Sequence, residues 1–174
     1  MTQREGGFTL IELLIVVAII SIIAAIAVPG LLRARMTGNE TSALASLKVT
    51  SSSQVMYSTS CGNGGFAASY AVLGTPPAAG GEGFISADLG GSATPSKSGY
   101  NFTLGGDTGS VAGPNDCNAT ATITAWYATA VPQTVGTTGT RGFAVNSGNT
   151  VWQDTSGAAP TTPFTASATV SPAQ

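Results

Sequence analysis

At 174 residues the chain has the length of one domain, and charged residues make up 8% of it, against about a quarter in an average soluble protein. The formal net charge is −2 and the six Lys and Arg residues are scattered, so no basic stripe is present and we expect no specific nucleic-acid binding. Because the sequence has no histidine and only two cysteines, it lacks His-dependent general bases, His-ligated zinc and Cys-rich metal sites. We therefore predict no enzyme, no cofactor and no metal.

The first element in chain order is an apolar stretch, Phe8 to Val28, in which Glu12 is the only charged residue. As an α-helix this stretch is roughly 31 Å long, about the hydrocarbon thickness of a bilayer. Residues 8–28 are therefore predicted to be a transmembrane or apolar packing helix.

The helix is predicted to continue through residues 29–58 as an amphipathic segment. Pro29 removes one backbone hydrogen-bond donor, so we expect a kink there. The apolar stripe of this second half has mostly three- and four-residue spacings, and its predicted members are Met36, Ala43, Leu44, Leu47 and Val55.

Residues 59–174 have the short apolar runs and the Gly, Ser, Thr and Pro punctuation that are typical of a small β-rich domain. Residues 58–99 and the tail after Asp154 carry mostly loop signals. The aromatic side chains of Trp126, Tyr127 and Trp152 are interpreted as core or cross-strand residues rather than as a ligand platform. Four strands are predicted, at Tyr100–Leu104, Thr122–Val131, Arg141–Asn146 and Thr150–Asp154, the last two joined by a hairpin at Ser147-Gly148.

Three interpretations of the apolar N-terminus compete. The first is an ordinary single-span anchor, in which Glu12 would be costly, at about 2.5 to 3.5 kcal/mol near mid-bilayer. The second is a secretory signal peptide cut near Ala25-Ile26-Ala27, for which the apolar stretch is too long and an internal Glu is foreign.

The third interpretation rests on the residues around Gly7. The stretch GFTLIELLIVVAII, from Gly7 to Ile20, resembles the class III signal of type IV pilins and of type II secretion pseudopilins. In that family a prepilin peptidase cuts after the glycine that corresponds to Gly7 and methylates the new N-terminus, here Phe8. The resemblance thus implies a leader peptide at residues 1–7, and Pro29 matches a proline of the family.

The resemblance also gives Glu12 a role in filament assembly. The amine that cleavage frees on Phe8 is mostly cationic at neutral pH, and a buried carboxylate is far less costly beside such a cation than alone. We expect Glu12 to pair with the Phe8 amine of a neighbouring copy and so to set the axial register of a helical filament.

The pilin resemblance implies an α+β fold, in which the second half of the long helix packs against a small antiparallel sheet of about four strands. It places Cys61 and Cys117 outside the membrane, in an oxidising compartment where a disulfide is expected, with two buried free thiols as the alternative. The Asn115-Asp116 pair with Asn118 has one carboxylate and indicates a turn rather than a cation site.

The function that follows is that of a structural subunit of a type IV pilus-like filament serving surface adhesion, twitching motility or DNA uptake. Its expected partners are further copies of itself, the prepilin peptidase and the pilus assembly machinery of the bacterial inner membrane. The precursor would reside in that membrane and the product in an extracellular pilus. The alternatives are a minor pilin, a pseudopilin of a periplasmic pseudopilus, and a membrane-tethered binding module or adhesin that never polymerises.

Overall fold

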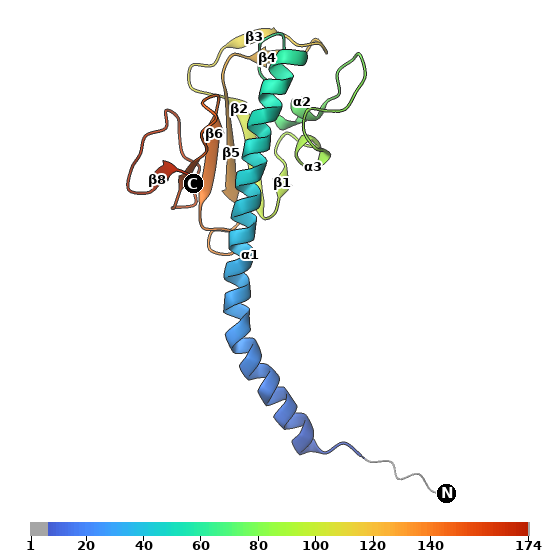
Figure 1. Ribbon diagram of the computed structural model, residues 1–174, viewed down its shortest axis with the longest axis vertical. Coiled ribbons are helices and arrows are strands. Elements are labelled where there is room, and N and C mark those ends of the chain that lie inside the picture. The colour runs from blue at the N-terminus through green and yellow to red at the C-terminus, as the bar shows by residue number, and fades with distance from the viewer. Residues whose placement is uncertain (1–6, 174) are drawn as a thin grey trace, which may run out of the picture. The chain divides into compact units, whose positions relative to one another are not determined.

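The computed structural model describes residues 7–173 (Figure 1), so that most of the predicted leader at residues 1–7 lies outside the described residues. The chain divides into two compact units between Arg35 and Met36, which we call the N-terminal unit and the head. One long helix, α1 (Leu10–Ser60), contributes its first half to the N-terminal unit and its second half to the head.

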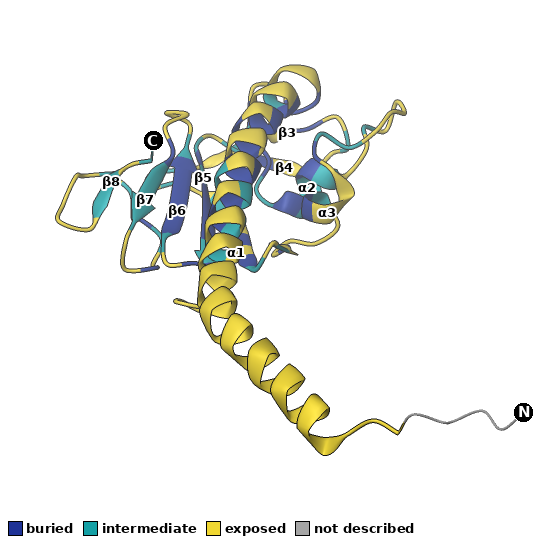
Figure 2. Cartoon of the chain, turned by 60° about the horizontal axis from the view of Figure 1, so that its bottom comes forward, coloured by how far each residue is buried: buried dark blue, intermediate teal, exposed yellow. Residues whose placement is uncertain are grey.

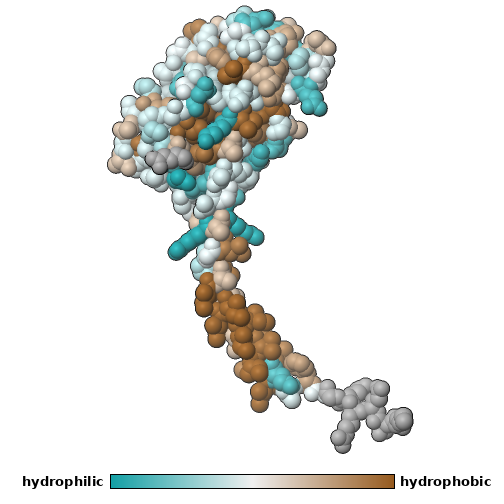
Figure 3. All heavy atoms as spheres, viewed as in Figure 1, coloured by the Kyte–Doolittle hydropathy of each residue, from teal (hydrophilic) through white to brown (hydrophobic). Residues whose placement is uncertain are grey.

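In the N-terminal unit, the large apolar side chains of α1 are exposed. Every described residue from Gly7 to Arg35 is exposed (Figure 2), and the apolar residues form a continuous band in Figure 3. The helix continues through Pro29, which lies inside it, so the predicted kink is not accompanied by a break in the helical assignment.

The head contains a six-stranded antiparallel sheet in the order β1-β2-β5-β6-β7-β8 and a separate antiparallel pair, β3-β4. The strands are β1 (Ser96–Lys97), β2 (Tyr100–Gly106), β3 (Ala112–Asn115), β4 (Ala121–Ile123), β5 (Trp126–Pro132), β6 (Gly142–Asn146), β7 (Trp152–Asp154) and β8 (Val170–Pro172). Two short helices, α2 (Tyr70–Gly74) and α3 (Ala87–Gly90), lie between α1 and the first strand.

The core of the head lies between α1 and one face of the larger sheet. Alternate residues of β2 point inward, as the two-residue period of a strand requires, and the register places Phe102 opposite Ala130 of β5. Ala130 in turn lies opposite Phe143 of β6, so that large and small side chains alternate across the face. The helix adds Leu47 and Tyr57 to this core. The α+β fold with a long N-terminal helix packed on an antiparallel sheet is therefore confirmed.

The face that α1 buries in the head is more polar than the predicted apolar stripe. Ala43 and Leu47 are buried as expected, but Val55 is 49% exposed, and the expectation for that residue was wrong. Polar side chains take most of the remaining buried positions, and several of them form hydrogen bonds within the head. Gln54, for example, donates to the carbonyl of Ala67 and accepts from its N–H, both at 2.9 Å. No buried side-chain nitrogen or oxygen of the described residues lacks a hydrogen-bond partner.

The strands agree with the sequence in position but not in number. The predicted strand at Thr122–Val131 is two strands, β4 and β5, which belong to different sheets. Residues 58–99 contain α2, α3 and β1, and the tail after Asp154 contains β8, all of which the loop signals missed. The tail is held by its aromatic residue, because the ring of Phe164 stacks on Trp152 at a centroid distance of 5.5 Å and lies 6.2 Å from Tyr127.

Candidate assembly site: the first turn of the N-terminal helix

The bond between Gly7 and Phe8 lies in non-helical chain just before α1. Both residues are exposed, Phe8 at 76%, and a side chain added at Gly7 would meet nothing within 4 Å. None of the described residues therefore crowds the predicted cleavage point.

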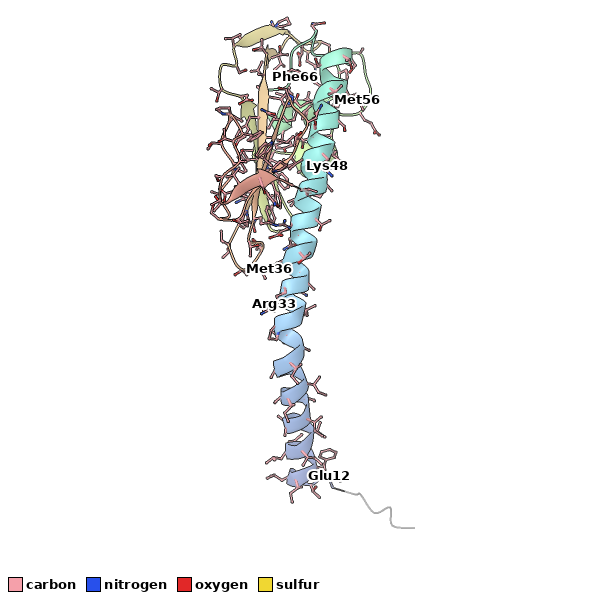
Figure 4. The ribbon with its side chains drawn as sticks, turned by 60° about the vertical axis from the view of Figure 1, so that its left-hand side comes forward. Glu12, Arg33, Met36, Lys48, Met56 and Phe66 are labelled. Carbon is pink, nitrogen blue, oxygen red and sulfur yellow. A yellow bond between two sulfur atoms is a disulfide. The ribbon has the colours of Figure 1, made fainter. Side chains whose placement is uncertain are left out.

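The first turn of α1 is closed by a reciprocal pair of hydrogen bonds between Thr9 and Glu12. The carboxylate of Glu12 accepts from the Thr9 backbone N–H at 2.9 Å and from its hydroxyl at 2.7 Å, while the Glu12 backbone N–H donates to the Thr9 hydroxyl at 3.2 Å. This arrangement is a capping box, in which two helix-terminal donors are satisfied by the residues themselves. Figure 4 shows Glu12 at this end of the helix.

Thr9 is the residue that the sequence analysis missed. A threonine three residues before a glutamate at the start of an apolar run is a recognisable signature of a helix N-terminus, and the sequence contains it. In the uncut chain the Glu12 carboxylate therefore accepts its hydrogen bonds from Thr9. The predicted contact of Glu12 with the Phe8 amine of another copy involves a processed neighbour and remains a prediction.

After this turn the helix surface is apolar on all sides. The exposed fractions of its Leu, Ile and Val side chains between Leu10 and Leu32 range from 45% to 78%. The one hydroxyl in the middle of the stretch, on Ser21, donates to the carbonyl of Val17 at 2.7 Å and so is satisfied within the helix. By length and composition α1 is the one helix among the described residues that could cross a membrane.

In the head, a disulfide joins Cys61, directly after α1, to Cys117, two residues after the end of β3. The two Cα atoms are 4.8 Å apart, and the Cys117 backbone N–H donates to the Cys61 carbonyl at 2.8 Å. The second half of the bridge thus lies in the connection between β3 and β4.

The carboxylate of Asp116 lies beside the disulfide and is buried. It accepts from the hydroxyl of Tyr57 at 2.7 Å and from the backbone N–H groups of Asn118 and Thr120 at 2.8 and 2.7 Å. Burial, together with this carboxylate, raises the pKa of the Tyr57 phenol, so that the phenol stays a donor. These contacts make the segment a turn fixed to α1, and within residues 7–173 no group of three or more acidic, Cys or His residues could hold a metal.

A second fixed point on α1 is the carboxylate of Glu40, only 6% exposed. It accepts from the backbone N–H and hydroxyl of Thr140, each at 2.8 Å, and forms an ion pair with Arg141 at 2.6 Å. Burial opposes ionisation of Glu40, but the hydrogen bonds from Thr140 and the Arg141 guanidinium outweigh it and hold the pKa of Glu40 below its usual value.

Comparison with known proteins adds two findings. Residues 2–28 match the family model of the prokaryotic N-terminal methylation motif. The chain is also similar to the type IV wide pilus major component PilA4 of Thermus thermophilus, with 51% identity over 55 residues. The aligned segment is 32% of this chain and 42% of that relative, so the chain covers less than half of the relative's length. No solved structure matches the chain.

The matched motif covers the Gly7–Phe8 bond and the capped first turn, and the head has the fold that the N-terminal resemblance implies. The methylation motif, the similarity to a type IV pilus component over about a third of the chain, and the long helix packed on an antiparallel sheet together support the resemblance to type IV pilins.

Proposed function

We propose that the chain is a structural subunit of a type IV pilus-like filament, held in the bacterial inner membrane by the first half of α1 until it is assembled. Type IV pilins are structural proteins, and the proposed role is non-enzymatic. The observation that carries the proposal is the exposed apolar half of α1, which begins directly after the Gly7–Phe8 bond and has Glu12 in its first turn.

This apolar segment needs an apolar environment, because contiguous patches of this kind are rarely left in water. A bilayer supplies that environment to the precursor, and a bundle of the same helices from other copies supplies it in the filament. Leu, Ile, Val and Ala suit both surroundings, since lipid tails and packed helix faces are equally apolar. The proposed partners are therefore the membrane, further copies of the chain, the prepilin peptidase and the assembly machinery.

The subunit is proposed to be a component of surface pili used for adhesion, twitching motility or DNA uptake. A minor pilin or a type II secretion pseudopilin is the second candidate, since the matched N-terminal motif is equally consistent with it.

The proposal is tested by shearing filaments from cells that express the chain and measuring the intact mass of the subunit. We expect the bulk filament protein to begin at Phe8 and to carry one added methyl group. A chain that begins at Val28 would indicate conventional secretion instead. A chain that retains residues 1–7 and is confined to the membrane would indicate a simple anchor. Both outcomes would contradict the proposal.

A further inference from the structure

Two charged side chains in the described part of the head, Lys48 and Glu82, take part in no ion pair or hydrogen bond within the chain. The other charged side chains there are held by named partners: Glu40 by Arg141, Asp88 by Lys97, Asp107 by Asn146, Asp116 by Tyr57 and Asp154 by Ser156. One cation and one anion are thus left on the surface of the head.

Lys48 lies on the side of α1 that faces away from the sheet (Figure 4). It borders an open depression of about 440 Å³ whose other lining residues are Ser51, Ser52, Val55 and Asn149. The floor is fixed, because the hydroxyl of Ser51 donates to the side chain of Asn149. Val55, which the packing of the head leaves half exposed, gives the depression an apolar wall.

Glu82 lies on a projecting turn, residues 78–82, in the segment between α2 and α3, where every residue is exposed (Figure 2). Gly80 and Gly81 have positive φ angles of 96° and 128°, and a side chain added to either would meet nothing within 4 Å. The turn therefore stands clear of the rest of the head at these positions.

The base of this turn is nevertheless held in place. The backbone N–H of Ala78 donates to the side chain of Asn118 at 2.6 Å, and that side chain donates to the carbonyl of Pro76 at 3.1 Å. On the other side, the N–H of Phe84 donates to the carbonyl of Leu73 at 2.8 Å. A projecting turn that is fixed at both ends loses little conformational freedom when it binds.

We propose that the turn at residues 78–82 of one copy docks into the Lys48 depression of the next copy, and that Glu82 forms an ion pair there with Lys48. The inference rests on the proposed function, since it assigns a contact between heads within the filament. The two patches are different surfaces of one chain, so the contact is heterologous, and repetition of such a contact builds an open helical array. Charge complementarity selects a second copy as the occupant, because the described part of the head itself carries both the unpaired cation and the unpaired anion.

The first test is charge reversal in cells that lack the wild-type copy. The quantity measured is the ratio of the amount of subunit in sheared filaments to the amount of subunit in cells. Loss of an exposed ion pair weakens a contact by up to about fivefold, and reversal adds repulsion, so Lys48→Glu and Glu82→Lys are each expected to lower this ratio about fivefold or more. The double variant should restore it. Lys97→Glu is the matched control, because it makes the same change in charge at a pair that lies within one chain.

The second test places one cysteine at each position. Filaments of the Lys48→Cys, Glu82→Cys double variant should yield, on oxidation, a ladder of dimers, trimers and larger species, whereas either single variant should yield none. A ladder that stops at dimers, a cross-link to a different protein, or filaments in which the pair never cross-links would overturn the inference. Wild-type cells without filaments would instead contradict the proposed function, so the two failures are distinguishable.

Discussion

Single residues of α1 hold it to the rest of the head, and Glu40 does so with its charge. Its carboxylate is buried and receives donors from Thr140 and Arg141, which belong to the segment that leads into β6. A buried carboxylate without these donors would be costly, whereas here both oxygens accept hydrogen bonds, one from Thr140 and Arg141 and the other from Arg141. The contact joins residues 100 positions apart in the sequence and closes the end of the sheet onto the helix.

Replacing Glu40 with Gln should lower the free energy of unfolding by about 1 to 3 kcal/mol, because the amide keeps an acceptor but loses the charge and places an N–H₂ group opposite donors. The measurement is urea denaturation of the full chain in detergent, followed by the fluorescence of the buried Trp126. Glu82→Gln, at an exposed and unpaired position, is the matched control and should leave the transition within about 0.5 kcal/mol of wild type.

The same residue predicts a pH dependence. Because the pKa of Glu40 is lower in the folded than in the unfolded chain, ionised Glu40 stabilises the head above its unfolded pKa, and this contribution is lost as the pH falls through the folded pKa. The unfolding free energy of wild type should therefore fall more steeply below about pH 4.5 than that of Glu40→Gln. If the unfolding free energies of the two proteins fell equally steeply with decreasing pH, Glu40 would not be the responsible group.

Among the elements, the end of α1 is attached to the small sheet at two neighbouring places. The disulfide joins Cys61 to Cys117, and the hydroxyl of Tyr57 donates to Asp116 one residue before it. The chain segment closed by the disulfide includes α2, α3 and β2, so the bridge restricts a long part of the unfolded chain.

Cys61→Ser should therefore lower the free energy of unfolding by about 2 to 5 kcal/mol and reduce accumulation of the subunit in cells. The double variant Cys61→Ser, Cys117→Ser should behave the same, which separates loss of the bridge from the effect of a lone thiol. Titration of thiols in the unfolded, unreduced wild-type chain checks the premise: two reactive thiols would show that the bridge does not form.

The elements also show how far the sequence predicts the structure. The long helix and the positions of β2, β5, β6 and β7 follow from apolar runs and turn residues, which are local signals. β8 and the helical turn of α2 do not, because their stability comes from contacts far away in the sequence. β8 pairs with β7, while the tail before it is anchored by Phe164 on Trp152.

The polar face of α1 was missed for the same reason. The hydroxyl of Thr50 is acceptable in the core because it lies 3.0 Å from the hydroxyl of Tyr70, and Gln54 is acceptable because Ala67 offers both of its backbone groups. No periodicity of apolar residues reveals such pairings. The candidate site, in contrast, can be predicted from local sequence. Gly7, Thr9 and Glu12 lie within one six-residue stretch, and the spacing of Thr9 and Glu12 is that of a capping box.

For the whole molecule, the proposal gives the two units separate tasks. The head is a folded domain with satisfied polar groups and a disulfide, whereas the N-terminal unit exposes the apolar surface that a bilayer or a bundle of helices must cover. Glu12 is the charge in that surface, and its role decides between an assembling subunit and a lone anchor. In a lone anchor it is an unfavourable group that is only tolerated.

Replacing Glu12 with Val separates these two roles, and Glu12→Gln refines the comparison because an amide oxygen can still accept from Thr9 and keep the helix capped. In a filament both variants leave the neighbour's Phe8 amine without a carboxylate. Breaking one partner of a buried pair costs roughly 3 to 5 kcal/mol, enough to shift an assembly equilibrium by about two to three and a half powers of ten.

The most direct measurement is the amount of subunit in sheared surface filaments from cells whose only copy carries Glu12→Val. The proposed role predicts that this subunit is inserted in the membrane at a normal level but is absent from filaments. Glu12→Gln should give the same defect. Normal filaments from the Glu12→Val cells would contradict it and would show that Glu12 is not needed to bring one copy into register with the next.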